Sequence, residues 1–223
     1  MTDDPYAFLS PASARTAGGH TPVLRTPIER AHLVAGAVLA ERDGWQVAVY
    51  EREGAELWIA DLSHLGKLDV RAGADEVDAL TGHLPPLQAR ADDGVWTLRL
   101  TGTRAMVICP FARVGELRGR IGAAAIDVTS NWAAVAVGGE QRREVLQRSS
   151  GLDVRERRFG PGSCMPGSVM RVSTILLNRG ESFLMLVGWE FGEYFWEAIR
   201  DAGVNLGIVP VSSAVAEPAG APA

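Results

Sequence analysis

Two aspartates are the residues of this chain whose type and spacing best suit acid–base chemistry. Asp61 lies in the stretch Ile59-Ala60-Asp61-Leu62-Ser63-His64, and Asp127 lies in Ala125-Ile126-Asp127-Val128-Thr129-Ser130. A positioned carboxylate can act as a general acid or base. Each aspartate also follows a predicted strand at a turn, where this residue commonly accepts hydrogen bonds from backbone N–H groups. We favour the capping role for both.

The two aspartates belong to a unit that occurs twice. One offset of 66 residues relates three pairs of positions: Asp61 and Asp127, Gly73 and Gly139, and Leu80 and Leu146. In each copy a short polar turn precedes an alternating apolar strand, a glycine and an amphipathic helical turn. Because only two copies occur, the pattern indicates a pseudo-symmetric domain and not a solenoid.

Other residues that could do chemistry lack partners at the required spacing. The four histidines and two cysteines form no metal-binding pattern, so we expect no metal site. Phosphate-loop and dinucleotide-binding fingerprints are also missing. Cys164 stays open as a reactive thiol. The arginines between 142 and 158 favour a solvated surface over a docking patch. Five aromatic residues lie between Trp189 and Trp196, and they cannot all face one side of a helix, so we expect some to contact a partner.

Composition indicates a globular chain of 223 residues, 47% hydrophobic and 22% charged, with a net charge of −5. The acidic balance argues against nucleic acid and anionic membranes as partners. No apolar run approaches the roughly 20 residues that a membrane helix needs. The first 22 residues do not resemble a secretory signal, so we expect a cytoplasmic protein.

The predicted elements define an α+β fold, in which mostly antiparallel sheets carry helices on one face. Helices are predicted over 27–37, 74–81, 114–122, 140–149 and 191–202. Strands are predicted over 45–50, 57–60, 67–71, 95–100, 105–109, 124–128, 132–137, 170–177, 182–187 and 204–211, with 67–71 packed beside 57–60. Residues 1–22 are predicted to form a flexible arm and 212–223 a disordered tail. Residues 23–211 then form one domain of two similar halves, about 23–122 and 123–211.

Several short motifs resemble the opening of the glycine-cleavage T-protein family. They are Thr26-Pro27-Ile28-Glu29-Arg30-Ala31-His32, Gly36-Ala37, Gly44-Trp45 with Val49-Tyr50, and Ile59-Ala60-Asp61-Leu62-Ser63. The resemblance implies a T-protein-like, internally duplicated folate-binding domain and tetrahydrofolate as a cofactor. The chain is too short for that family's C-terminal barrel. An acidic residue of catalytic members falls, by this resemblance, within 167–174, where the chain has Ser173 and Thr174. We therefore expect no catalytic residue in this chain.

The length and later motifs are similar to the γ subunit of heterotetrameric sarcosine oxidase. This resemblance implies an accessory subunit of a flavin- and tetrahydrofolate-dependent oxidative N-demethylase, bound to flavoprotein subunits that carry the flavin. One alternative is a stand-alone tetrahydrofolate-dependent one-carbon transferase or demethylase, and another is a pure folate-binding or assembly protein. Self-association into a homo-oligomer also stays open. If a cofactor binds, we expect it between the two halves, at Trp132, Arg171, Ser173 and Trp189.

Overall fold

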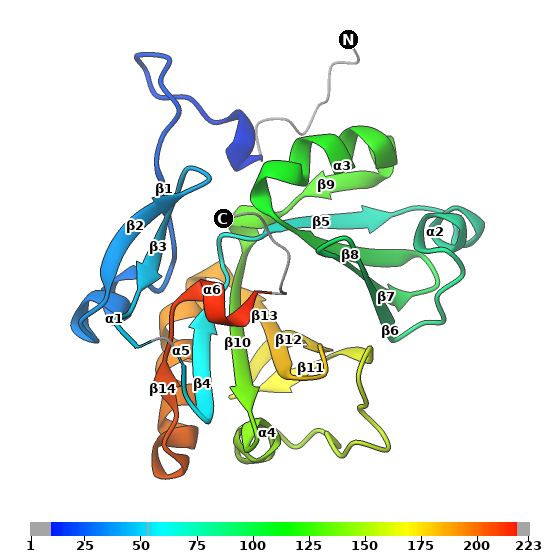
Figure 1. Ribbon diagram of the computed structural model, residues 1–223. Coiled ribbons are helices and arrows are strands. Elements are labelled where there is room, and N and C mark those ends of the chain that lie inside the picture. Colours follow the sequence, from blue (N-terminus) through cyan, green and yellow to red (C-terminus); the bar gives the residue numbers. More distant parts are fainter. Residues whose placement is uncertain (1–9, 53, 218–223) are drawn as a thin grey trace.

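The computed structural model describes residues 10–52 and 54–217 (Figure 1). Its helices are α1 (Glu29–Val34), α2 (Ala74–Thr81), α3 (Val114–Ile121), α4 (Arg142–Ser149), α5 (Gly192–Gly203) and α6 (Ser213–Ala216). Its strands are β1 (Leu24–Arg25), β2 (Val38–Arg42), β3 (Trp45–Val49), β4 (Leu57–Asp61), β5 (Gly66–Arg71), β6 (Gln88–Asp92), β7 (Val95–Thr101), β8 (Arg104–Cys109), β9 (Ala125–Asp127), β10 (Trp132–Gly139), β11 (Cys164–Val169), β12 (Val172–Asn178), β13 (Ser182–Gly188) and β14 (Val209–Pro210).

One order of elements occurs twice along the chain. The first half runs β4–β5–α2–β6–β7–β8–α3, and the second runs β9–β10–α4–β11–β12–β13–α5. A single 3₁₀ turn precedes the last helix of each half, at Phe111–Arg113 and at Trp189–Phe191. The predicted pseudo-duplication is therefore confirmed in the order of elements.

The two halves exchange their first strands. The β5 sheet has the order β6-β7-β8-β5-β9, and the β10 sheet has the order β11-β12-β13-β10-β4, with β14 beyond β4. Val135 lies opposite Asp61 in one sheet, and Leu68 lies opposite Asp127 in the other. The prediction that 67–71 packs beside 57–60 is wrong, because alternating apolar residues specify a strand but not its partner. The registers make Lys67 and Ala134 equivalent positions.

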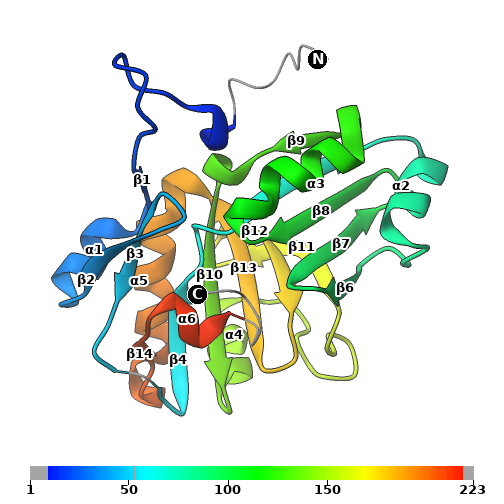
Figure 2. The same ribbon diagram turned by 45° about the horizontal axis from the view of Figure 1, so that its top comes forward.

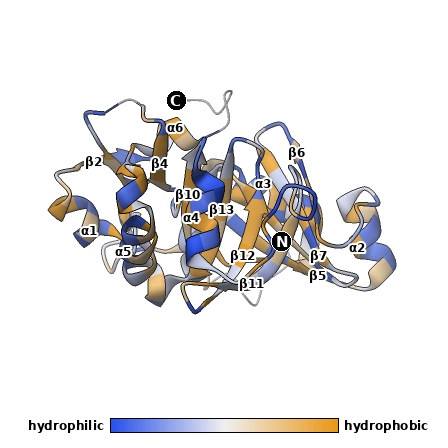
Figure 3. Ribbon diagram, turned by 90° about the horizontal axis from the view of Figure 1, so that it is seen from below, coloured by the Kyte–Doolittle hydropathy of each residue, from blue (hydrophilic) through white to orange (hydrophobic). Residues whose placement is uncertain are grey.

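The two sheets pack face to face and carry helices on their outer faces (Figure 2). Leu98 and Met106 of the β5 sheet share a buried cluster with Ala136 and Leu186 of the β10 sheet. A second cluster joins α2 and α3 to the outer face of the β5 sheet, and a third joins α4 and α5 to the β10 sheet. Apolar residues gather along the central strands, whereas α4 is hydrophilic (Figure 3). The predicted antiparallel α+β class is confirmed, with helices on one face of each sheet.

The segments outside the two halves add a small sheet, the buried residue Ser10 and the short helix α6. Strands β1, β3 and β2 form a three-stranded sheet in which Trp45 is buried. Ser10 is buried as well, whereas residues 1–9 of the predicted arm lie outside the described residues. The disorder predicted from residue 212 is wrong as far as 217. Ser213–Ala216 forms α6, because Ala216 packs into the core between the sheets; residues 218–223 lie outside the described part.

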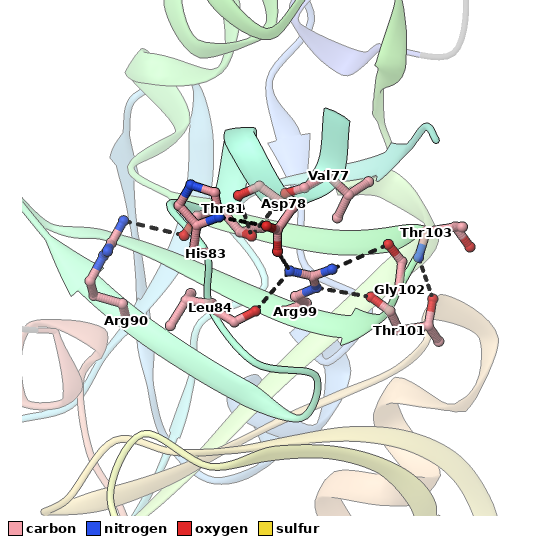
Figure 4. Close-up of polar contacts among 10 residues, drawn as sticks. All are labelled: Val77, Asp78, Thr81, His83, Leu84, Arg90, Arg99, Thr101, Gly102 and Thr103. Carbon is pink, nitrogen blue, oxygen red and sulfur yellow. Dashed lines mark hydrogen bonds and ion pairs between the residues drawn. The ribbon is translucent and has the colours of Figure 1, made fainter. Parts of the chain in front are cut away.

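Polar contacts also tie α2 to the β5 sheet (Figure 4). The Arg99 side chain on β7 is buried and donates to Asp78 on α2 and, over 2.9 Å, to the carbonyl oxygen of Leu84. His83 contacts the other Asp78 oxygen at 2.5 Å. Because the guanidinium is occupied by protein acceptors, this cluster is structural.

Candidate functional site

Asp61 is the centre of a buried hydrogen-bond network that joins three parts of the chain: Thr26 and His32, Tyr50, and the turn at Asp61–Ser63. One carboxylate oxygen accepts from the backbone N–H of Ser63 over 2.9 Å and from its hydroxyl over 2.5 Å. The other accepts from the Thr26 hydroxyl and lies 2.9 Å from His32 Nε2. His32 Nδ1 lies 2.8 Å from the Tyr50 hydroxyl, so the imidazole links tyrosine to carboxylate. The expected capping role of Asp61 is confirmed.

The motif residues of the T-protein resemblance are thus brought together, but in the interior. His32 is fully buried and Asp61 nearly so. Burial alone would raise the pKa of Asp61, but hydrogen bonds from His32, Ser63 and Thr26 lower it to about 2. Burial raises the pKa of Tyr50 to about 12. The carboxylate is therefore ionised and the phenol protonated near neutral pH.

Asp127 repeats this arrangement in the second half. Its Oδ1 accepts from the backbone N–H of Thr129 over 2.9 Å and from the Thr129 hydroxyl over 2.6 Å. Its Oδ2 accepts from the hydroxyl of Ser10. The expected capping role is confirmed here too.

Lys67 lies between the two aspartate turns and is completely buried. Its ammonium donates to the carbonyl oxygen of Ser63 over 2.7 Å. Burial lowers the pKa of Lys67 to about 7, although Asp61 and Asp127 act in the opposite direction. No sequence pattern predicted this group, because a lysine in an alternating strand normally faces solvent.

A cavity of about 160 Å³ opens where the two sheets meet the β2–β3 hairpin. We call it cavity 1. Its apolar wall includes Leu65, Trp96, Ile108, Phe111 and Leu184, and its polar wall includes Arg42, His64, Arg179 and Glu217. An apolar chamber with a few charged groups at one side is typical of a site for a small organic ion. The sequence did not predict this site, since its residues come from both halves, from the β2–β3 hairpin and from the segment after α6.

A second, more open cleft of about 530 Å³ lies in the pseudo-equivalent place. We call it cleft 2. Trp132 and Ser173, two of the predicted cofactor residues, line it together with Asp69, Arg71, Arg104, Val128, Asn131, Val172, Gly188, Glu190 and Phe191. Asp69 lies between two arginines, at 2.9 Å from Arg71 Nε and 2.8 Å from Arg104 Nε.

The other two predicted cofactor residues are not among those that line cleft 2. Arg171 occupies the β11–β12 hairpin turn with φ of 63° and is exposed. Trp189 lies against Trp45, with ring centroids 6.2 Å apart. Phe111 is the equivalent residue of the first half and contacts the same Trp45, at 5.6 Å. Trp189 therefore helps to seat the N-terminal sheet.

The aromatic cluster divides between core and surface. Phe195 and Trp196 are fully buried, so these two of the five aromatic residues belong to the core and not to a surface that could contact a partner. Trp196 lies edge-on to His32, with ring centroids 4.7 Å apart. Phe191 and Tyr194 are 44% and 52% exposed and are the members available to a partner.

The remaining candidates have structural roles. Cys164 is buried, and burial raises its pKa to about 12, which argues against a reactive thiolate. In the basic run, Arg142 donates to the carbonyl oxygens of Gly139 and Gly180, and Arg155 pairs with Asp153. Among the described residues, no His, Cys, Asp and Glu side chains gather in a group that could hold a metal ion. Within the same residues, the helices are too short or too polar to cross a membrane.

The chain is similar to known proteins in sequence and in fold. No protein-family model matches the chain. An aminomethyltransferase of Streptomyces avermitilis is 24% identical over an alignment of 222 residues that covers 83% of this chain and 59% of the relative. The chain thus spans about three fifths of the length of the curated relative it matches.

Two solved structures share the fold. Aminomethyltransferase T of the Bartonella henselae glycine cleavage system superposes with a TM-score of 0.68 at 15% identity, over 86% of this chain and 60% of that one. A chain of heterotetrameric sarcosine oxidase from Corynebacterium sp. U-96 gives a TM-score of 0.63 at 20% identity, over 84% of this chain and 98% of that one. The chain is therefore similar in sequence to an aminomethyltransferase, and it shares its fold with an aminomethyltransferase and with a chain of heterotetrameric sarcosine oxidase.

Proposed function

We propose that the chain is an accessory, γ-like subunit of a flavin-dependent complex that oxidatively demethylates an N-methyl amine, and that it is not catalytic by itself. The observation that carries the proposal is the extent of the structural match. The chain covers 98% of a sarcosine oxidase chain but only 60% of an aminomethyltransferase. A match to nearly the whole of one component of an assembly supports a similar place for this chain in an assembly.

The buried carboxylates support a non-catalytic role. Both oxygens of Asp61 and of Asp127 already accept hydrogen bonds from protein groups. A general base must reach the proton that it removes, which a saturated and buried carboxylate cannot do without rearrangement.

We propose cavity 1 for the carboxylate end of tetrahydrofolate, because about 160 Å³ is too small for the whole molecule. Arg42, His64 and Arg179 would bind a carboxylate, and Trp96 and Phe111 would contact the aromatic ring beside it. Bound there, the cofactor would supply an acceptor for a one-carbon unit, while this chain would hold and orient it.

Co-expression with any flavoprotein subunits encoded beside its gene tests the proposal. We expect a purified complex that contains this chain and shows flavin absorbance. Phe191→Ser and Tyr194→Ser should weaken assembly by about tenfold or more, as loss of an interface aromatic can, with an unchanged melting temperature. Val204→Ser is the matched control, because Val204 is also exposed, at 64%, beyond the far end of α5. A colourless chain that never co-purifies with a flavoprotein would contradict the accessory role.

A stand-alone one-carbon transferase is the second candidate, and the sequence similarity to an aminomethyltransferase favours it. Incubation of the purified chain with tetrahydrofolate and a methylamine donor separates the two. We expect no turnover. Turnover without a flavoprotein, abolished by Asp127→Asn, would instead establish the transferase.

A further inference from the structure

The side chain of Glu217 is buried against cavity 1. We call the groups that surround it, Arg42, His64 and Arg179, the seat. Arg42 Nη1 and Nη2 donate to its two carboxylate oxygens, each over 2.7 Å. His64 Nε2 lies 3.0 Å from Oε1. Only 6% of the Glu217 side chain is exposed. Two parallel bonds from one guanidinium form the arrangement with which arginine binds carboxylates of ligands.

The residues that hold Glu217 come from other parts of the chain. Arg42 ends β2 and is paired with Trp45 in the hairpin, and His64 lies in the turn that Asp61 caps through Ser63. Arg179 comes from the β12–β13 turn and donates to the carbonyl oxygen of Ala216 over 2.7 Å. Withdrawal of Glu217 would remove the carboxylate that Arg42 binds through two hydrogen bonds, and would leave its half-buried guanidinium group without this partner.

The segment that carries Glu217 is short and is anchored where it begins. Ser212 marks its start, where the Ser212 hydroxyl accepts from the backbone N–H of Tyr50 over 2.9 Å. From there α6 has four residues, far below the length at which a helix is stable alone. Its position therefore depends on burial of Ala216 and on the contacts with Arg42, His64 and Arg179.

We propose that Arg42, His64 and Arg179 form the carboxylate subsite of cavity 1, and that residues 213–217 are a strap whose own carboxylate fills this subsite until an anionic ligand displaces it. The ligand class is a planar aromatic anion, with its acid group in the seat and its ring against Trp96 and Phe111. This inference deepens the proposed ligand site and adds its regulation by the chain itself, and it rests on cavity 1 being that site.

Fluorescent probes of matched shape test the strap without tetrahydrofolate or any partner. Anilinonaphthalene sulfonate is a planar anion, and N-phenyl-1-naphthylamine is its uncharged counterpart. We expect Glu217→Ala to bind the anion about tenfold more tightly than the unaltered chain, because a ligand that needs a minor open state loses affinity in proportion to its population. Affinity for the neutral probe should change less than about twofold, since the seat then contributes nothing.

Two further variants separate this mechanism from general loosening. Arg42→Ala combined with Glu217→Ala should lose the gained affinity for the anion. Glu144→Ala, which breaks the exposed pair with Arg148, should leave both probes unaffected. Equal anion affinity in the unaltered chain and Glu217→Ala would overturn the strap, and so would an equal gain for the neutral probe.

Hydrogen exchange gives a readout that does not depend on a variant that folds. In the unaltered chain, saturating anionic probe should accelerate amide exchange in 213–217, whereas the neutral probe should not. Unchanged exchange under saturating anion would overturn the proposal. Because neither measurement uses tetrahydrofolate, failure of the strap and failure of folate binding are distinguishable.

Discussion

The Asp61 turn and the Asp127 turn share one design and differ in what was added to it. In both, the aspartate ends a strand that joins the sheet of the other half, and its Oδ1 binds the N–H and hydroxyl of the residue two positions on. The hydroxyls then accept from equivalent backbone N–H groups, those of Ala134 and Lys67. The Oδ2 atoms differ: Asp61 meets Thr26 and His32, and Asp127 meets Ser10.

This difference shows which part of the motif the duplicated fold requires. The Oδ1 contacts hold the turn that follows each exchanged strand, so they recur in both turns. The Oδ2 contacts join the duplicated core to segments outside it, and only the Asp61 turn has a histidine there. Comparing the two turns by mutation measures that addition.

The largest effect expected is the unequal loss of stability in Asp61→Ala and Asp127→Ala. Removing Asp61 leaves buried His32, Thr26 and Ser63 without their acceptor, which should lower the free energy of unfolding by about 3–5 kcal/mol. Removing Asp127 leaves fewer donors and should cost about 1–3 kcal/mol. Urea denaturation of both variants gives the two values. Equal losses would show that His32 adds nothing to the Asp61 turn.

Lys67 offers a second test, because its equivalent in the other half is Ala134. The pKa is about 7 in the folded chain and 10.5 for a lysine in its ordinary, solvated state, so between these values the unfolded chain binds more protons. The lysine contribution should therefore make stability rise with pH across this window, by at most about 1.4 kcal/mol per pH unit.

Lys67→Met should lack this slope. The unfolding free energy of the unaltered chain minus that of Lys67→Met should then rise as pH rises from 7 towards 10. A difference that stays constant over this range would show that Lys67 keeps its charge in the folded chain.

The stability of the Asp61 turn in acid gives a third test, with a smaller expected effect. The pKa of Asp61 is lowered from 3.8 to about 2, so its carboxylate contributes stability above pH 3.8 that is lost as pH falls through about 2. Asp61→Ala should therefore show a shallower fall in stability between these pH values than the unaltered chain. Circular dichroism at stepped pH checks this. Parallel acid profiles would contradict the role given to Asp61.

The smallest difference concerns the hydroxyls at Oδ2. Thr26 donates to Asp61 and also accepts from the backbone N–H of Ile28 over 3.2 Å, so Thr26→Ala should cost about 1–2 kcal/mol. Ser10 has one partner at Asp127 and precedes a loosely packed segment, so Ser10→Ala should cost about 0.5–1 kcal/mol. Thermal melts of both resolve the order, and a greater loss for Ser10→Ala would reverse it.

Local pattern predicted most elements of the two halves. Alternation located β5, β7, β8, β10 and β13 within two residues, and helix α2 at its observed bounds. The strands β2, β6 and β11 were missed. Strands β2 and β6 are largely exposed, whereas Pro166 and Gly167 obscure the pattern of β11. The predicted strand 204–211 instead begins with a 3₁₀ turn at Val204–Leu206, and only Val209–Pro210 lies in the sheet.

The sequence by itself determined the duplication, the antiparallel α+β class, and the capping role of both aspartates. These features depend on residues close together in the chain and on the periods of strands and helices. The tertiary structure alone decided which sheet each first strand joins, the burial of Lys67 and Trp196, and the residues of cavity 1. Each of these joins groups far apart in sequence, such as Arg42 and Glu217, and a local period carries no information about such partners.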